Sequence, residues 1–208
     1  MRGRDSRFEK DKELHDLAES QGGFFTTSQA EKLGFLRQHH SHEEGVRWEK
    51  ISRGIYRHKL LNISENKEEL HILRLHFLKK DGSEGIVFSG ETAASVQGIG
   101  DFLPQKVFAL MEDKRRLKAT PPLDIEIKRV ASLAKFESRT RDNLPVTTPA
   151  QTLIDLLTIY DTDPEEVRRA FTQARNDGKL TSGEVRETLS RPVAESVQRL
   201  FKEWEASI

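Results

Sequence analysis

The chain has 208 residues, 34 Lys and Arg against 34 Asp and Glu, and no cysteine. The lack of cysteine excludes a disulfide scaffold, a thiolate zinc site and a cysteine nucleophile, and a chain of this length can bury a core without such links. A net charge of zero argues against a protein that coats nucleic acid without sequence preference, so any contact with DNA would come from a local basic patch.

Three short helices are predicted in the first 45 residues. They cover residues 7–20, 28–33 and 36–44; the first has an apolar stripe of Leu14, Leu17 and Ala18 at helical spacing, whereas the third has a weak apolar face. Gly22 ends the first helix because glycine tolerates the left-handed conformation of a helix end. Thr26 or Thr27 caps the second helix, and Gly34 makes a tight turn into the third.

The pattern changes from helical to extended between Trp48 and His58. Apolar residues flank the turn at residues 52–54, which predicts a β-hairpin with Arg53 at its tip. Residues 61–67 contain two Asn and one Ser and are interpreted as a linker.

The remainder predicts an α+β domain with a helical C-terminus. The expected strands are 85–88, 106–111 and 123–130, with helices at 68–80 and after Ser89 and Thr148. We expect Ser89 to cap its helix and the helix after Thr148 to be buried nearly all round, because its apolar residues occupy every side. Three amphipathic helices follow, with apolar stripes that start at Val167, Val185 and Val193.

Two short helices joined by a tight turn and followed by a basic hairpin are typical of a winged helix-turn-helix. The major groove of B-DNA is about 12 Å wide and admits one α-helix. That helix contacts bases through its N-terminal residues, while the hairpin would contact the backbone or the minor groove. The candidate DNA-binding residues are Thr27, Ser28, Arg37, Gln38, His39, Ser41, His42, Lys50, Arg53 and Arg57.

The charge of this region is only modestly basic. Residues 34–59 contain six Lys or Arg, three Glu and four His. Glu43 and Glu44 would repel phosphates if they pointed at DNA, and a small helical module with a solvated face would show a similar pattern. His39, His40 and His42 have no nearby carboxylate or thiol that would complete a metal site, so we expect no metal.

Several short fragments stand in a fixed order along residues 14–160. They are Gly23–Ala30, Gly34-Phe35, Arg37–His39, Arg47–Ile51, Arg53–Arg57, Phe88–Ala94, Asp101–Pro104 and Val146–Leu156. In this order and spacing they resemble the AbiEi-type antitoxins of type IV toxin–antitoxin systems. The resemblance implies a repressor that binds repeats of double-stranded DNA in its own promoter, with self-association there. It also implies that the chain counters a nucleotidyltransferase-like toxin without a stable complex.

Two alternatives stay open beside the antitoxin. One is a stand-alone winged-helix regulator with no toxin partner. The other is a metal-dependent nuclease, because alternation on the strand at 123–130 puts Glu126 and Lys128 on one face, with Asp113 as an upstream acid. Any half-buried strand alternates in this way, so we expect no enzyme activity and no cofactor.

The sequence thus predicts two domains. Residues 1–61 would form the DNA-binding winged helix-turn-helix, and residues 62–208 an α+β antitoxin-type domain in which no site residue can be named. No run reaches the about 18 apolar residues of a membrane span, and the start of the chain lacks an apolar signal segment. We therefore expect a cytoplasmic protein that does not contact membranes.

Overall fold

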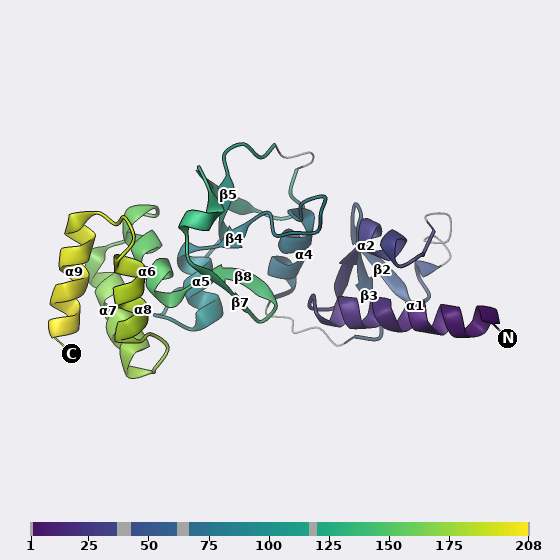
Figure 1. The fold of residues 1–208 in the computed structure, drawn as a ribbon, viewed down its shortest axis with the longest axis horizontal. Helices are drawn as coiled ribbons and strands as arrows, with labels where there is room; N and C mark the ends of the chain where they lie inside the picture. The colour runs from purple at the N-terminus through teal and green to yellow at the C-terminus, as the bar shows by residue number, and fades with distance from the viewer. Residues whose placement is uncertain (1, 37–42, 62–66, 117–119, 208) are drawn as a thin grey trace. The chain divides into compact units, whose positions relative to one another are not determined.

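The chain forms two compact units, each built from helices and strands (Figure 1). The computed structural model describes residues 2–36, 43–61, 67–116 and 120–207. One unit comprises Met1–Ser83 with Thr120–Leu123, and the other comprises Glu84–Ala119 with Asp124–Ile208. The α+β prediction and the helical C-terminus are confirmed. Within the described residues, no helix is both long and apolar enough to cross a membrane.

The first unit contains a three-stranded antiparallel sheet. Its elements in chain order are α1 (Arg2–Glu19), β1 (Phe24–Thr26), α2 (Thr27–Lys32), β2 (Trp48–Ser52), β3 (Ile55–His58) and α4 (Glu68–His76). The strand order is β1-β3-β2, so the predicted hairpin at residues 48–58 is confirmed as β2 and β3. The strand β1 was not predicted, because three residues are too few to show alternation.

Both faces of this sheet are covered, because adjacent residues of a strand point to opposite sides. Phe25 faces α1 and α2, where it packs with Leu14, Trp48 and Tyr56. Its neighbour Phe24 faces the other way and joins a second buried cluster. That cluster contains Phe24 and Ile55 from the sheet and Ile72 and Leu75 from α4.

The helix α4 therefore belongs to the first unit, which extends to Ser83 and not to the predicted boundary at residue 61. Residues 61–67 look like a linker by composition, but the sequence does not show that the next helix returns to the same sheet. The helix ends at His76, four residues before the predicted end.

The second unit contains a five-stranded mixed sheet with strand order β6-β5-β4-β8-β7. Its elements are β4 (Val87–Phe88), α5 (Gly90–Gln97), β5 (Val107–Glu112), β6 (Ile125–Val130), the 3-10 helix η2 (Leu133–Lys135), β7 (Ser138–Arg141), β8 (Leu144–Thr147), α6 (Pro149–Thr158), α7 (Pro164–Asn176), α8 (Ser182–Leu189) and α9 (Glu195–Ala206). The pairs β4–β8 and β5–β6 are parallel, and β4–β5 and β7–β8 are antiparallel. The hairpin β7–β8 was not predicted.

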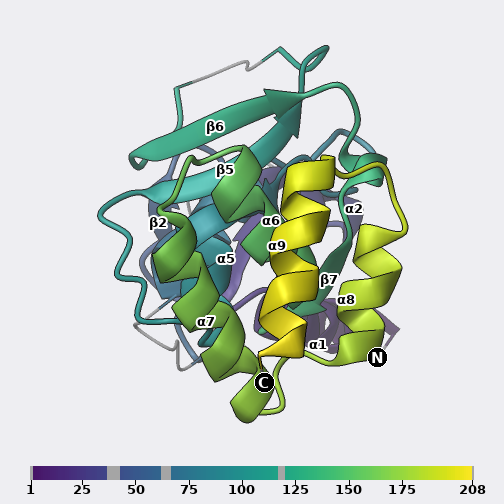
Figure 2. The ribbon, with the colours of Figure 1, turned by 90° about the vertical axis from the view of Figure 1, so that its left-hand side faces the viewer.

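The helix α6 forms the centre of the helical core. Thr148 caps it through its side-chain oxygen, Pro149 occupies the first turn, and its residues from Pro149 to Leu156 are buried, as predicted. Apolar residues of α5, α7, α8 and α9 complete the same cluster. Figure 2 shows α7, α8 and α9 as neighbouring helices.

Ser89 stands at the N-cap position of α5, but its side chain does not cap the helix, so that prediction was wrong. Its hydroxyl instead donates to Oδ2 of Asp155 at 2.5 Å, and Gln151 Nε2 donates to Oδ1 at 2.8 Å. The buried carboxyl group of Asp155 has few other partners, so it takes the serine hydroxyl from the helix end.

Candidate nucleic-acid interface

The first turn of α2 lies beside the turn of the β2–β3 hairpin. The backbone N–H of Thr27 donates to the carbonyl oxygen of Gly54 at 2.9 Å. This contact follows from the sheet register, because Thr26 at the end of β1 pairs with Ile55 at the start of β3. The arrangement brings Thr27 and Ser28 close to the hairpin tip.

A capping box fixes the start of α2. The Thr26 hydroxyl oxygen accepts from the backbone N–H of Gln29, and the Gln29 side chain accepts from the backbone N–H of Thr26 at 2.8 Å. Such reciprocal bonds satisfy two of the donors that a helix start leaves unpaired. Ser28 remains exposed in this turn.

The hairpin turn consists of two residues, Arg53 and Gly54, between the paired residues Ser52 and Ile55. Gly54 has φ +80°, in the left-handed region that favours glycine. The turn is therefore tight, and it holds the Arg53 side chain out in solvent.

Several cations of the predicted basic patch have partners inside the protein. Arg47 donates to Asp11 of α1 and to Glu43, both at 2.7 Å. The hydrogen bond to Glu43 is the main cause that raises the pKa of Arg47. Glu43 is buried and pairs with Arg47. It therefore does not point at DNA, where it would have repelled phosphates.

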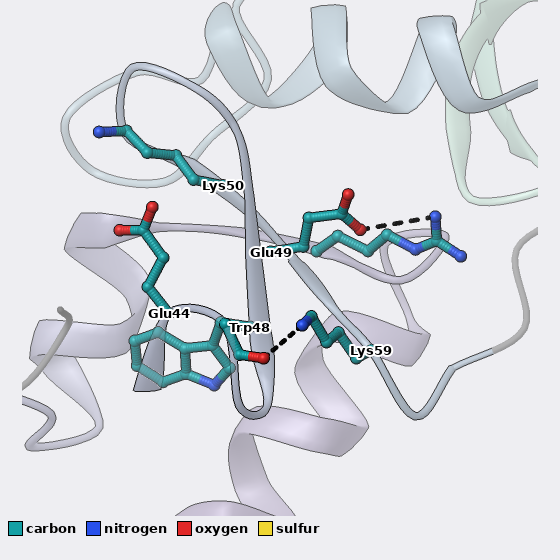
Figure 3. A pocket seen from close by; sticks show the side chains of 7 residues that line it. Glu44, Trp48, Glu49, Lys50 and Lys59 are labelled. Atoms are coloured by element: carbon teal, nitrogen blue, oxygen red, sulfur yellow. Dashed lines mark hydrogen bonds and ion pairs between the residues drawn. The ribbon is translucent and has the colours of Figure 1, made fainter. Parts of the chain in front are cut away.

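A shallow hollow lies along β2 and β3 of the first unit (Figure 3). Its lining residues are Glu44, Gly45, Trp48, Glu49, Lys50, Arg57 and Lys59. Arg57 Nη1 lies 3.8 Å from a carboxylate oxygen of Glu49 across the strand pair. The Lys59 ammonium donates to the main-chain carbonyl of Gly45, whereas the Lys50 side chain extends away from Lys59 (Figure 3).

Lys50 and Arg53 differ from these paired cations. Both are exposed, and within the described residues neither side chain has a hydrogen bond or an ion pair. Their positive charge is therefore available to a ligand without the loss of an internal contact. An incoming anion at Arg57 would instead compete with Glu49.

The structure thus brings together the described half of the predicted DNA-binding residues. Thr27, Ser28 and Arg53 gather at the hairpin tip, while Lys50 and Arg57 lie further along the hairpin. The other predicted residues, Arg37, Gln38, His39, Ser41 and His42, lie outside the described residues. Sequence reasoning counted Arg47 as part of the basic patch, although its i, i+4 spacing from Glu43 was a signal of an internal pair.

The strand proposed for a nuclease presents a closed charge cluster. Glu126 contacts both Lys106 and Lys128, the latter at 2.9 Å, and the hydrogen bond from Lys106 is the main cause that lowers its pKa. Among the described residues, the one group of three possible metal ligands lies on α1 and consists of the half-buried His15 and the exposed Asp16 and Glu19. Glu126 belongs to no such group, so the geometry gives the nuclease alternative no support.

No protein-family model matches the chain, and no curated protein matches it. Among solved structures, the chain is similar to the crystal structure of the RV2827C protein from Mycobacterium tuberculosis. The two share 15% sequence identity with a TM-score of 0.52, over 85% of this chain and 70% of that chain. At this identity the likeness concerns the fold alone.

Proposed function

We propose that the first unit is a winged helix-turn-helix that binds double-stranded DNA. The observation that carries the proposal is the hairpin tip, where the unpaired Arg53 stands beside the first turn of α2. A groove-binding helix needs a neighbouring element that holds the backbone, and an arginine on a tight turn can approach a phosphate closely. Residues 37–42 would supply the contacts with bases.

The biological role that we propose is that of an antitoxin and repressor of its own operon. It is supported by the ordered fragments that resemble those of AbiEi-type antitoxins, including Gly23–Ala30 and Val146–Leu156. In this role the protein acts in the cytoplasm, self-associates on promoter repeats and counters a nucleotidyltransferase-like toxin without a stable complex. A gene for such a toxin next to this one would favour the antitoxin over a stand-alone regulator.

A titration of the protein on its own upstream DNA tests the proposal. We expect specific binding that is tighter than binding to a shuffled duplex of the same length, and weaker binding for the Lys50→Ala, Arg53→Ala double variant. Each lost phosphate contact should lower the slope of log K against log salt by about 0.9. Equal binding of the upstream and shuffled DNA would refute a repressor, and no binding to either would refute DNA recognition.

A further inference from the structure

A second group of unpaired cations lies in the second unit, in the turn that follows β5. Residues 112–116 together with Arg129 contain four cations and two acids. Lys114 and Arg116 are exposed, and their side chains have no hydrogen bond or ion pair within the part of the chain that the structure describes. The run from Lys114 to Arg116 was visible in the sequence, but nothing there showed how it is held.

Arg129 holds this turn in shape. Its Nη1 donates to the carbonyl oxygens of Asp113 and Arg115, at 3.0 and 2.9 Å. The backbone N–H of Asp113 also bonds to the carbonyl oxygen of Val130, at 2.8 Å, so the turn is tied to β6 at two places. A carbonyl does not neutralise a guanidinium, so Arg129 keeps its positive charge and adds it to those of Lys114 and Arg116.

The turn is separate from the paired cluster around Glu126. Residues alternate along β6, so Arg129 faces the side opposite to Glu126 and Lys128. The acids of that cluster therefore do not screen the turn directly. The four cations of the turn, Arg129 included, outnumber the two acids Glu112 and Asp113, and three of these cations are exposed around a backbone that Arg129 fixes. This excess of positive charge favours a polyanion such as a sugar–phosphate backbone.

We propose that the turn at Lys114–Arg116, positioned by Arg129, binds the phosphate backbone of duplex DNA. The inference rests on the proposed function for the identity of the polyanion, and it adds a contact from the second unit to those of the hairpin. The contact is independent of sequence, because only phosphates are touched. It raises the affinity for specific and non-specific DNA alike.

The test compares full-length variants by fluorescence anisotropy on the upstream duplex and on a shuffled duplex, over a range of salt concentrations. For Lys114→Ala with Arg116→Ala, the loss of two phosphate contacts should lower the salt slope by about 1.8 on both duplexes. The control is Arg199→Ala with Lys202→Ala, which removes the same charge from exposed positions on α9 and should keep the wild-type slope. Lys114→Arg with Arg116→Lys should also keep it.

A wild-type slope for the Lys114, Arg116 variant, or an equal loss in the α9 control, would overturn the inference. If the Lys50, Arg53 variant then still weakens binding, the proposed function stands and only the second contact fails. If the wild-type protein binds neither duplex, both fail together. Circular dichroism of each variant confirms that the changes, all at exposed positions, leave the fold intact.

Discussion

In the first unit the centre of the core is aromatic, whereas in the second unit a carboxyl group lies inside the core. Trp48 packs against Phe25 and Phe35, whose ring centroids lie 5.0 and 5.3 Å, respectively, from that of Trp48. Asp155 is buried beneath Ser89 and accepts its hydroxyl hydrogen bond. The first unit is thus stabilised at its centre by apolar packing, and the second unit in addition by a polar contact between α6 and the start of α5.

The surfaces differ in a corresponding way. Among the residues that the structure describes, Lys50 and Arg53 on the hairpin of the first unit have no partner. On the edge strand β6 of the second unit, by contrast, Glu126 pairs with both Lys106 and Lys128. The lesson is that the number of cations in a segment says little about its capacity to bind an anion. What matters is which cations have already been neutralised within the fold.

Truncation of the two buried tryptophans, one in each unit, should destabilise the protein most. Trp48→Ala and Trp204→Ala each remove a buried indole, from side chains 2% and 4% exposed, and should each cost about 3–5 kcal/mol of stability in their own unit. Hydrogen exchange checks this prediction: Trp48→Ala should lower protection of β1–β3, and Trp204→Ala that of α7–α9. A loss of protection in both units from either substitution would show that the two units unfold as one.

The next effect concerns the buried carboxyl of the second unit. Burial raises the pKa of Asp155 to about 7, against an ordinary value of 3.8. The folded protein therefore holds a proton between about pH 4 and 7 that the unfolded chain releases. The contribution of Asp155 to stability is therefore present at low pH and is lost as the pH rises through the folded pKa of about 7. Between pH 5 and 8 the free energy of unfolding should fall by roughly 2–3 kcal/mol.

The variant Asp155→Asn isolates this contribution, because asparagine cannot ionise. As the pH rises from 5 to 8, the wild type should lose about 2–3 kcal/mol of stability that the variant keeps. Denaturant unfolding of both proteins at each pH measures this change in their difference. A difference between the two proteins that stays constant with pH would mean that Asp155 titrates in its ordinary range, and that the contrast between the two cores is structural only.

The smallest expected effect separates two arginines of the same hairpin. Arg53→Ala removes an unpaired cation and should lower the salt slope of DNA binding by about 0.9. Arg57 is paired with Glu49 and half-buried, so Arg57→Ala should change the slope by less. Anisotropy titrations of the two single variants over a range of salt concentrations measure both slopes. An equal decrease in slope for the two variants would mean that pairing within the fold does not determine which cations bind DNA.

Much of the fold could be predicted from the sequence where the signals are local. The turn at Arg53-Gly54 and the Thr148-Pro149 helix start are determined by residues next to one another, and the structure confirms both. The strand β1 and the hairpin β7–β8 were missed, because β1 has three residues and the exposed residues of β7 show no apolar alternation. Their pairing depends on distant partners.

The sequence located the candidate site, but it did not show which of its cations are paired within the fold and which are free to bind an anion. The sequence placed Lys50, Arg53 and Arg57 on one hairpin, as the structure has them. It did not show that Arg57 faces Glu49, or that the start of α2 bonds to the hairpin turn, because both facts depend on sheet register across separate strands. Ser89 was misassigned for the same reason, since its partner Asp155 lies 66 residues away.

If the tip of the β2–β3 hairpin lies against DNA, a cleaving group attached to the tip should cut the DNA backbone beside it. Because the chain has no cysteine, Arg53→Cys provides a single attachment point for an iron chelate that cleaves nearby DNA. At saturating protein and low salt, we expect cleavage confined to a few nucleotides of the bound upstream DNA, and none from the cysteine-free wild type treated with the same chelate. Cleavage from position 53 that is absent, or spread evenly along the duplex, would contradict it.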